Sequence, residues 1–538
     1  MTSDRRYAVG FLSLAFCSLA ACGGRSAPAV ADADWPAYNR TLAGDRFSPL
    51  DEIDRGNVAG LVPVCSYSLP QVSGLQTGPI VISGTMYFTT ETHSYAIDAA
   101  TCAEKWSVEH TIERRSALGA NRGFAYADGR LFRGTSDGHV IALDPADGHT
   151  IWDSTIDVDL PGVSMPMAAI AGNGLVFIGH AGGDQTGVTG HAYAFDADDG
   201  SMVWRFDVVP DDEAVLATWP NRDRYPITGG AFWTSFALDA ERNVLYVPAG
   251  NPAPDFDVEA RRGDNLYTNS LIAIDAATGR LLGYNQIVKR DNHDWDVNSP
   301  PVIATTRAGL PIVVSANKDG LLSVLNRSEL ATDSPASADL SARLPIVFQS
   351  PTTTRENVDV PLSRTEPVRF CPGATGGNEW NGPAFHPGLN LLYTGTVDWC
   401  TTVQLQAEPE VPSPGAIWFG SALQMQDPVE DARGWLKAFD ADSGAVRWQF
   451  EASTPVLAAV TPTAGGLVFS AELAGRLRAF DADTGAILWE FDLGQSTGGG
   501  IISYSAGGRQ RIAVATGMRS PIWPTVAEES RIDVFGLP

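Results

Sequence analysis

The sequence predicts an all-β protein, an eight-bladed β-propeller whose blades dock on one another through repeated tryptophans. A phrase of the form Ala-x-Asp, three residues, Gly, three residues, Trp occurs six times in complete or altered form. Repeats with a period of roughly 40–50 residues and β-type content are typical of propellers. The 54 glycines and a charged fraction of only 19% suit a turn-rich body of mostly buried strands.

Each copy of the phrase predicts a β-hairpin. One strand ends at Ala-x-Asp, the residues from Asp to Gly form the turn, and the next strand begins at the Trp. Since one hairpin cannot bury both of its faces, we expect the Trp to act as a wedge between adjacent blades. In chain order the copies begin at Ala96, Ala142, Ala194, Ala273, Ala438 and Ala479. The first has Cys102 instead of Gly, the fourth has Gly283 instead of Trp, and degenerate copies at 321–326 and 389–394 are expected to complete eight blades.

The first 22 residues have the composition of an export signal and are not expected to join the fold. Arg5 and Arg6 precede an apolar run that is short for a membrane span. The run ends at residues 19–23 (LAACG), which resemble the lipobox of bacterial lipoproteins, where the cysteine, here Cys22, becomes the lipidated first residue. The alternative is an ordinary signal peptide cleaved nearby, and both place the mature protein outside the cytoplasm. With lipidation, the protein is held on the periplasmic side of a bacterial membrane by its lipid anchor only.

The chain after residue 22 divides into a linker at 23–34 and a single propeller at 35–538. Four cysteines lie outside the leader, at Cys65, Cys102, Cys371 and Cys400. An even number in an oxidising compartment predicts two disulfides. Of the three possible pairings, the one that joins neighbours in sequence, Cys65–Cys102 with Cys371–Cys400, is favoured.

The formal charge of −26 argues against nucleic acid or an anionic membrane surface as a partner. The sequence contains no Cys-x-x-Cys-His, so no covalently attached c-type haem is expected.

From Trp35 onward, and almost to Pro538, the chain resembles the quinoprotein dehydrogenases, eight-bladed enzymes that use pyrroloquinoline quinone (PQQ) and a calcium or lanthanide ion. The segments 35–39 (WPAYN), 46–50 (RFSPL) and 121–123 (NRG) carry part of this resemblance. It implies an enzyme that oxidises the hydroxyl of an alcohol or sugar, small or polymeric. Electrons would pass to a separate acceptor, cytochrome c or a quinone.

The resemblance also implies which residues contact PQQ. Trp233, in a segment reading WTSFALD, matches the family's flat floor on which the quinone stacks. Lys318 matches a cation that contacts the quinone oxygens, and Arg122 matches a residue that pairs with a PQQ carboxylate. The structural alternatives are another inter-blade Trp at 233 and a solvated turn lysine at 318.

Two further positions are less certain matches. The family's cofactor-contacting Asn falls at or beside Glu379, so that Asn378 and Glu379 are both candidates. Gln76 stands where the family has a Glu. Ser116 and Ala117 stand where the best-known alcohol-oxidising members have two adjacent cysteines, which fits a divergent branch or one that has lost its cofactor.

The base and the metal ligands are implied by three segments. The family's base is the Asp after Trp in a His-Asp-x-Trp-Asp segment, and Asp296 matches it, whereas the family places no base at the spacing of Asp294. The alternative is a solvated acidic loop. The metal ligands would be Asn251, Asp296 and, in place of a family Glu, Asp184. Asn298 stands where lanthanide enzymes carry an extra Asp, which favours calcium.

Two other functions stay open. One is a binding scaffold such as the propeller lipoprotein of outer-membrane protein assembly, which has the same anchor and no quinone. The other is a propeller that has kept the pocket and lost catalysis. A scaffold has no need for Trp233, Asn251, Asp296 and Lys318 together, so the enzyme is favoured.

Overall fold

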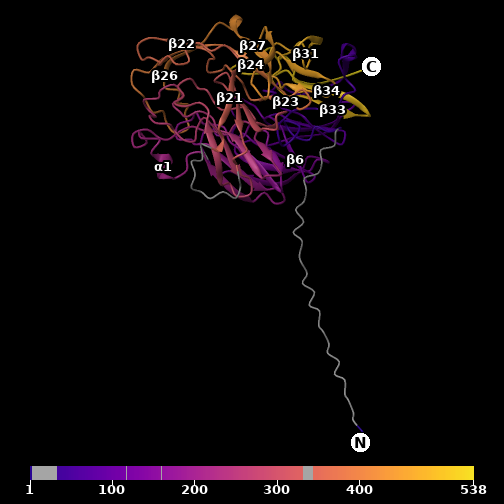
Figure 1. The fold of residues 1–538 in the computed structure, drawn as a ribbon, viewed down its shortest axis with the longest axis horizontal. Helices are drawn as coiled ribbons and strands as arrows, with labels where there is room; N and C mark the ends of the chain where they lie inside the picture. The colour runs from indigo at the N-terminus through magenta and orange to yellow at the C-terminus, as the bar shows by residue number, and fades with distance from the viewer. Residues whose placement is uncertain (3–32, 117, 159, 331–342) are drawn as a thin grey trace.

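The computed structural model shows a β-propeller of eight four-stranded antiparallel sheets (Figure 1). The structure describes residues 1–2 and 33–538, apart from 117, 159 and 331–342. The expected leader with Cys22, nearly all of the expected linker, and Ala117 lie outside the described residues. The first strands of neighbouring blades contact one another along the series β6, β10, β14, β18, β23, β29 and β33, which places them nearest the axis.

The strands of the first four blades have the following bounds: β2 (Ile80–Ile82), β3 (Thr85–Thr89), β4 (His93–Asp98), β5 (Glu104–Glu109); β6 (Ala125–Ala127), β7 (Arg130–Gly134), β8 (His139–Leu143), β9 (Thr150–Thr155); β10 (Ile170–Gly172), β11 (Leu175–Gly179), β12 (His191–Asp196), β13 (Met202–Asp207); β14 (Ala237–Asp239), β15 (Val244–Pro248), β16 (Ser270–Asp275), β17 (Leu281–Gln286). Those of the last four are β18 (Val302–Thr305), β19 (Pro311–Ala316), β20 (Leu321–Asn326), β21 (Ile346–Pro351); β23 (Ala384–His386), β24 (Leu391–Asp398), β27 (Arg433–Asp440), β28 (Val446–Ala452); β29 (Thr461–Pro462), β30 (Leu467–Ala471), β31 (Arg476–Asp481), β32 (Ile487–Asp492); β33 (Ile501–Ala506), β34 (Arg509–Thr516), β35 (Arg531–Gly536) and β1 (Val62–Ser68).

The repeated phrase forms the hairpin between the third and fourth strands of a blade, as predicted. In the third blade Ala194 pairs with Trp204 across the two strands. The Asp196 carboxylate accepts hydrogen bonds from the backbone N–H groups of Asp198 and Asp199, and so satisfies the turn. The fixed number of residues between the Asp and the Gly of the phrase is therefore the number that this turn needs.

The Trp of four hairpins packs on the turn of the next blade, whereas Trp489 of the last copy donates to the Leu61 carbonyl at 3.1 Å. A Cβ placed on Gly200 would lie 2.6 Å from the Trp152 ring, so only glycine allows the indole to come this close. The Trp152 indole N–H also donates to the carbonyl of Ala197, at 3.2 Å. The same contact joins Trp106 to Gly148, Trp204 to Gly279 and Trp448 to Gly485. The predicted wedge between blades is confirmed.

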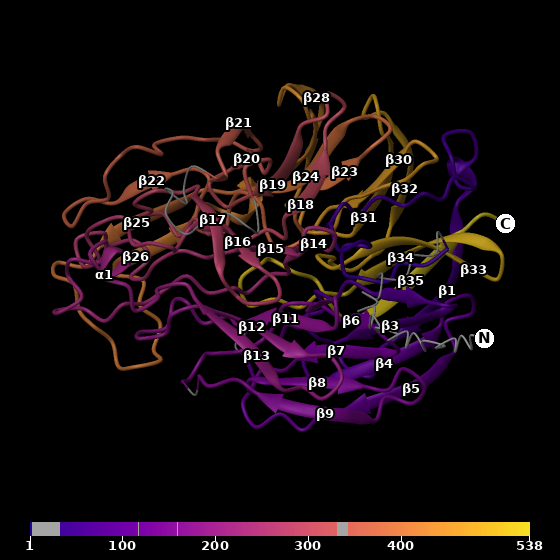
Figure 2. The same cartoon turned by 60° about the horizontal axis from the view of Figure 1, so that its bottom comes forward.

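The ring closes where the two ends of the propeller chain meet. Strand β1 is the outermost strand of the last blade, beside β35 (Figure 2). In this blade Cys65 pairs with Val534 as a repeat Trp pairs with its Ala, and Cys102 stands at the Gly position of the first blade's turn. The disulfide Cys65–Cys102 therefore replaces the Trp–Gly contact at the junction of the last and first blades.

One expectation about the blades is wrong. Residues 321–326 form β20 in the fifth blade as expected, but 389–394 largely fall in β24, which shares a blade with the copy at Ala438. The eighth blade is instead β33, β34, β35 and β1. It has no copy of the phrase, because its fourth strand comes from the start of the propeller chain.

A three-stranded sheet is inserted around the sixth blade. It consists of β22 (Val368–Phe370), β25 (Thr401–Leu405) and β26 (Ser421–Gln426), and lies at the same end of the molecule as α1 (Glu213–Leu216) in Figures 1 and 2. The second predicted disulfide, Cys371–Cys400, links its borders. Short 3₁₀ turns occur at Val58–Gly60 and Val429–Asp431.

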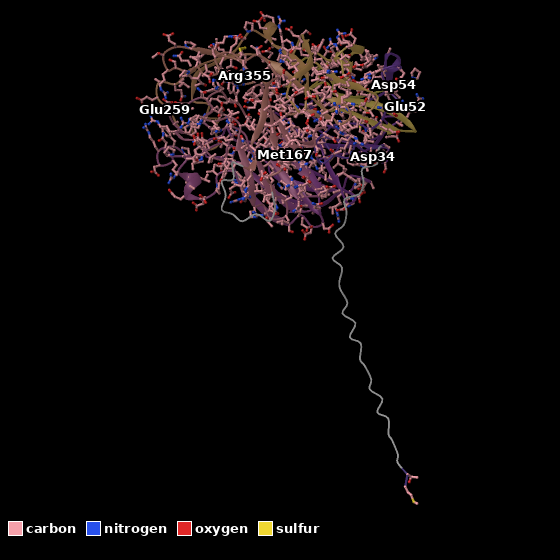
Figure 3. All side chains as sticks on the ribbon, in the orientation of Figure 1. Asp34, Glu52, Asp54, Met167, Glu259 and Arg355 are labelled. Carbon is pink, nitrogen blue, oxygen red and sulfur yellow. A yellow bond between two sulfur atoms is a disulfide. The ribbon has the colours of Figure 1, made fainter. Side chains whose placement is uncertain are left out.

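Some charged side chains lie at the surface, although others are buried, among them Arg46, Arg133 and Asp255. Glu52, Asp54 and Glu259 stand at the edges of the molecule, whereas Met167 is fully buried within it (Figure 3). No helix in the described part of the chain is long and apolar enough to cross a membrane.

The docking contact can be tested with two glycines of similar backbone conformation. Gly200 (φ +74°) touches Trp152, whereas a Cβ on Gly174 (φ +80°) would meet no atom within 4 Å. Alanine costs similar backbone strain at both positions, but Gly200→Ala also overpacks the indole, which should cost a further ~1–3 kcal/mol. We expect a thermal midpoint several degrees lower for Gly200→Ala than for Gly174→Ala. Equal midpoints would mean that the indole gives way freely.

Candidate active site

All the predicted cofactor, metal and base residues within the described chain lie on connections at one face of the propeller. In an antiparallel blade, the connection from the second to the third strand and the one leading to the next blade emerge at the same face. The repeat turns between third and fourth strands lie at the opposite face. The residues on the first face are Gln76, Arg122, Asp184, Trp233, Asn251, Asp296, Lys318, Asn378 and Glu379.

The carboxylate of Asp296 is the centre of the site. One oxygen accepts hydrogen bonds from the Asn251 backbone N–H at 3.0 Å and from the Trp233 indole N–H at 3.4 Å. The other accepts from the Lys318 ammonium at 3.1 Å. A Cβ on Gly250 would lie 2.5 Å from the first oxygen, so a glycine is needed there. Asp296 is buried, and its orientation is fixed at both oxygens.

The loop between β17 and β18 presents Asp296 through a buried turn. The Asp291 carboxylate accepts from the backbone N–H groups of His293 and Trp295, each at 3.0 Å. The Trp295 indole stacks on His293 and donates to the carbonyl of Pro372 at 3.1 Å. Asp291 and Trp295 thus hold the backbone on the N-terminal side of Asp296.

Lys318 bridges two carboxylates. Lys318 lies in the turn between β19 and β20. Its ammonium is 3.1 Å from the Asp296 carboxylate and 3.2 Å from the Asp294 carboxylate. Burial lowers the pKa of Lys318, but these two carboxylates raise it more, so the pKa lies well above its ordinary value. The lysine therefore stays charged. It does not lie in a solvated turn.

Arg122 lies between two indoles. Its guanidinium carbon is 5.1 Å from the ring centre of Trp233 and 5.4 Å from that of Trp380, and one N–H donates to the Trp233 carbonyl at 3.1 Å. The side chain is buried, and its Nε has no hydrogen-bond partner among the described residues. Burial lowers the pKa of Arg122 to about 10. A buried cation with an unused N–H group suits an anionic ligand.

The two candidates at 378 and 379 have different surroundings. The Asn378 amide oxygen accepts from the Thr352 hydroxyl at 3.0 Å, and its amide nitrogen donates to the Gly395 carbonyl at 2.8 Å. The Asn378 side chain thus holds the loop to neighbouring blades. The partly exposed Glu379 is the one that interacts electrostatically with Lys318, Asp296 and Arg122.

Glu379 adds a second carboxylate to the face that carries Asp296. Burial raises the pKa of Glu379 to about 8, although Lys318 lowers it and Asp296 raises it further. The carboxyl is therefore largely protonated near neutral pH.

Three carboxylates form a compact group beside Asp296. Oxygens of Asp184, Asp255 and Asp294 lie within 4.8 Å of one another, and the Asn251 amide nitrogen donates to Asp255 at 3.1 Å. Burial and the nearby charge of Asp296 raise the pKa of Asp184 to about 6. Burial and the neighbouring carboxylates place the pKa of Asp255 well above its ordinary value.

Asp255 and Asp294 are the residues that sequence reasoning missed, because the family resemblance assigns them no role. The signal for Asp255 was its place four residues after Asn251 in the segment NPAPD. For Asp294 the signal was its place two residues before Asp296.

The insertion of the sixth blade covers the Asp184 loop. The Trp418 backbone N–H donates to the Asp184 carbonyl at 2.8 Å, and Thr186 N–H donates to Ala416 at 2.9 Å. These contacts place a carboxylate from the third blade against a segment more than 200 residues later in the chain.

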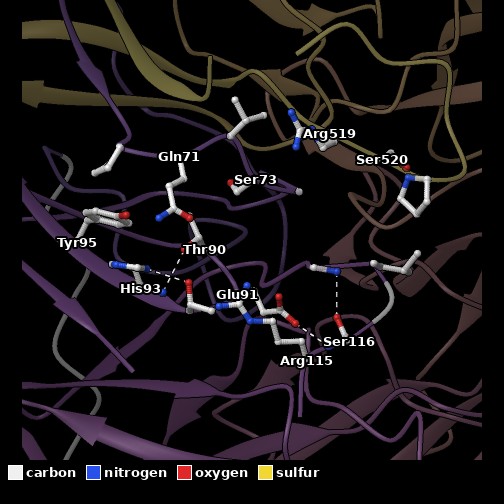
Figure 4. A pocket seen from close by; sticks show the side chains of 17 residues that line it. Gln71, Ser73, Thr90, Glu91, His93, Tyr95, Arg115, Ser116, Arg519 and Ser520 are labelled. Atoms are coloured by element: carbon white, nitrogen blue, oxygen red, sulfur yellow. Dashed lines mark hydrogen bonds between the residues drawn. The ribbon is translucent and has the colours of Figure 1, made fainter. Parts of the chain in front are cut away.

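Gln76 and Ser116 lie on the segments next to Arg122. The Gln76 side chain is buried with its amide oxygen unpaired, and the Gly78 N–H donates to the Arg122 carbonyl at 2.8 Å. A cavity of about 430 Å³ borders Ser116, where the Glu91 carboxylate accepts from the Ser116 N–H at 2.7 Å (Figure 4). Ser116, which stands where the best-known members of the family have a cysteine, is therefore in a polar environment.

Comparison with known proteins gives two family matches. Residues 35–329 match the family described as the glucose/ethanol/alcohol dehydrogenase β-propeller domain, with PQQ as its family name. Residues 432–529 match the family described as outer membrane protein assembly factor BamB.

Individual proteins are similar over most of the chain. Quinohemoprotein alcohol dehydrogenase ADH IIB of Pseudomonas putida is 30% identical over 94% of this chain and 78% of its own length. A lanthanide-dependent methanol dehydrogenase of Methylacidiphilum fumariolicum (strain SolV) is 27% identical, over 82% of this chain and 77% of its own. The crystal structure of the quinohemoprotein alcohol dehydrogenase from Comamonas testosteroni has a TM-score of 0.84 at 26% identity, covering 94% of this chain and 81% of that one.

The pKa of Glu379 predicts a pH dependence of stability. The unfolded carboxyl ionises near its ordinary pKa of 4.5 and the folded one near 8. Between these values the folded state holds a proton that the unfolded state has lost, so stability falls as pH rises. Glu379→Gln removes this fall, and should raise the thermal midpoint at pH 8 but leave it nearly unchanged at pH 5. Melting curves of the metal-free and PQQ-free protein measure this.

The matched control is Glu528→Gln, the same change at an exposed position. Its midpoint should follow the wild type at both pH values. A Glu379→Gln curve parallel to the wild type would show that Glu379 is ionised in the folded protein at neutral pH.

Proposed function

The chain belongs to the PQQ-dependent alcohol dehydrogenase family and is a quinoprotein oxidoreductase of that kind; from this premise we propose that it oxidises the hydroxyl of an alcohol or sugar with Asp296 as the base. The observation that carries the proposal is the buried Asp296 carboxylate, held by the N–H groups of Asn251 and Trp233 and by Lys318. Abstraction of a hydroxyl proton needs a carboxylate whose orientation is set in advance.

The residues of the site fit PQQ. A planar orthoquinone with carboxylate substituents needs a flat apolar surface and buried cations. The half-buried Trp233 indole offers the surface, and Arg122, with its unused Nε, and Lys318 offer the charges. When bound, PQQ supplies the acceptor of the hydride that leaves the substrate carbon.

The chain's own residues have separate tasks in this proposal. Asp296 accepts the hydroxyl proton, and Lys318 holds its carboxylate in place by donating to it at 3.1 Å. Arg122, Trp233, Lys318, Glu379 and Gln76 are the proposed contacts to PQQ. Asn378 supports them by fixing the loop that carries Glu379.

A hard cation is proposed at Asn251, Asp184 and Asp296. Carboxylate and amide oxygens are its preferred ligands, and it would act as a Lewis acid. Asn298, in place of the extra Asp of lanthanide enzymes, is the sequence's argument for calcium.

A scaffold function in outer-membrane protein assembly receives less support. The match at 432–529 contains two copies of the repeated phrase and none of the predicted site residues. That match reflects the docking repeat, which blades of many functions share.

The site is proposed to work outside the cytoplasm. The leader at 1–22 would export the chain, lipidation of Cys22 would hold it on the periplasmic side of a membrane, and electrons would pass to a separate acceptor, cytochrome c or a quinone.

Asp296→Asn is the test of the base. The amide is nearly isosteric but cannot accept the proton, so PQQ binding should persist while turnover falls by about 10²–10⁴-fold. PQQ is titrated with and without metal by the quenching of Trp fluorescence, and turnover of alcohols is then followed with an artificial dye. Absence of PQQ binding to the wild type under both conditions would contradict the proposed function.

The matched control is Asp319→Asn. Asp319 is a buried neighbour of Lys318 whose carboxylate accepts from the Leu321 N–H at 3.1 Å, a bond that Asn keeps. Asp294 cannot serve as the control, because it contacts Lys318 directly. Full turnover in Asp296→Asn, or an equal loss in Asp319→Asn, would remove Asp296 as the base.

Cys22→Ser tests the location. Without the lipid the protein should move from the membrane to the soluble fraction, with its melting curve unchanged, because the propeller begins after the linker. A lipoprotein carries more than one acyl chain, so attachment of the wild type should be firm. Fractionation followed by immunoblotting measures this, and a variant retained on the membrane would refute lipid anchoring at Cys22.

A further inference from the structure

The group of carboxylates beside Asp296 is larger than the family resemblance implies. We infer that Asp255 and Asp294 join Asp184 as ligands of the cation in this site, and that the site selects a trivalent cation over calcium. The inference rests on the proposed function, since it concerns the cation of the same site.

The three carboxylates come from separate parts of the ring. Asp184 lies between β11 and β12, Asp255 between β15 and β16, and Asp294 between β17 and β18. Their oxygens nevertheless lie within 4.8 Å of one another. Like charges at this separation repel one another, and a cation between them turns the repulsion into coordination.

Asp255 provides an independent observation. Its side chain is fully buried, and one of its oxygens accepts from the Asn251 amide at 3.1 Å. The other has no hydrogen-bond partner among the described residues. A buried carboxylate oxygen without a donor is costly, and a cation in the group would supply the missing partner.

Arg261, which interacts electrostatically with Asp255, does not fill this role. Arg261 donates to the backbone carbonyls of Pro254 and Asp255 at 2.8 and 2.9 Å, and also to that of Asp291. Its N–H groups therefore serve the backbone of the loop. The unpaired oxygen of Asp255 remains for a ligand.

The net charge of the side chains around the site distinguishes a trivalent ion from calcium. With a cation bound and all four carboxylates ionised, Asp184, Asp255, Asp294 and Asp296 bring four negative charges and Lys318 one positive charge, which leaves three. The buried Arg261 is offset by its neighbour Asp291. A trivalent ion balances the three remaining negative charges, whereas calcium leaves one buried negative charge uncompensated.

This inference reverses the calcium expectation based on Asn298. The Asn298 amide nitrogen donates to the Asn378 carbonyl at 3.1 Å, so this residue fixes the neighbouring loop. The carboxylate that position 298 lacks is supplied instead by Asp255, from the segment that also carries Asn251.

The test is metal binding by the purified full-length protein without PQQ or alcohol. After removal of metals with a chelator, the protein is titrated with terbium and, separately, with calcium, in a buffer that does not bind metals. Terbium is followed by luminescence sensitised by nearby tryptophans such as Trp233, and calcium by calorimetry. We expect terbium to bind at least about 10-fold more tightly than calcium.

Two variants test the ligands. Asp255→Asn can still accept from Asn251, and Asp294→Asn suits the positive φ of 63° at that position, which Asn tolerates. Loss of an indirect partner of a metal typically costs 10–100-fold in affinity, so loss of a direct ligand should weaken terbium binding by at least about 10-fold. The control Asp319→Asn should bind both ions as the wild type does.

The outcomes separate the two proposals. Unchanged terbium affinity in either variant that melts like the wild type overturns its assignment as a ligand, and calcium binding as tight as terbium binding overturns the preference for a trivalent ion. The proposed function is tested separately, by PQQ binding and dye-linked turnover, and neither outcome of the metal titration decides those assays. If the PQQ or turnover assay fails, the metal titration is still a valid test of the ligands.

Discussion

The packing of a tryptophan on the glycine turn of the next blade is the contact on which the ring depends. It recurs from Trp106 on Gly148 to Trp448 on Gly485, and each contact joins one blade to the next. At the junction of the last and first blades the same two positions carry a disulfide, Cys65–Cys102. This disulfide joins two residues 37 apart near the start of the propeller chain. The two ends of that chain are joined by the pairing of β1 with β35 within the last blade.

The docking contacts and the site occupy opposite faces of the propeller. The repeat turns form one face, and this leaves the other connections free to vary in length and sequence. Those connections carry every predicted cofactor, metal and base residue that the structure describes. The long ones include the insertion in the sixth blade, which contacts the loop that carries Asp184. A rigid ring can hold such loops in arrangements that the loops alone would not adopt.

The site holds several charged groups close together, which a rigid ring makes possible. Asp294 and Asp296 contact Lys318, and Asp184 and Asp255 lie close to Asp294. Burial raises the pKa of Glu379 to about 8. Arg122 is a second buried cation, with part of its hydrogen-bonding capacity unused. Such an arrangement is unfavourable by itself, and its charges match an anionic cofactor beside Arg122 and a cation beside Asp255. Binding of either should therefore stabilise the fold.

The sequence by itself predicted the propeller, the hairpin of each repeat and both disulfides, which the structure confirms, and it singled out Asp296 as the candidate base. Each of these predictions follows from residue types at a fixed local spacing or from a family segment. The sequence misplaced the eighth blade, whose fourth strand is supplied by the chain start and so breaks the repeat. It also gave no role to Asp255 and Asp294. Only the tertiary structure decided that these two meet Asp184, since the closeness of side chains on different blades depends on the angle between blades, and no spacing along the chain encodes it.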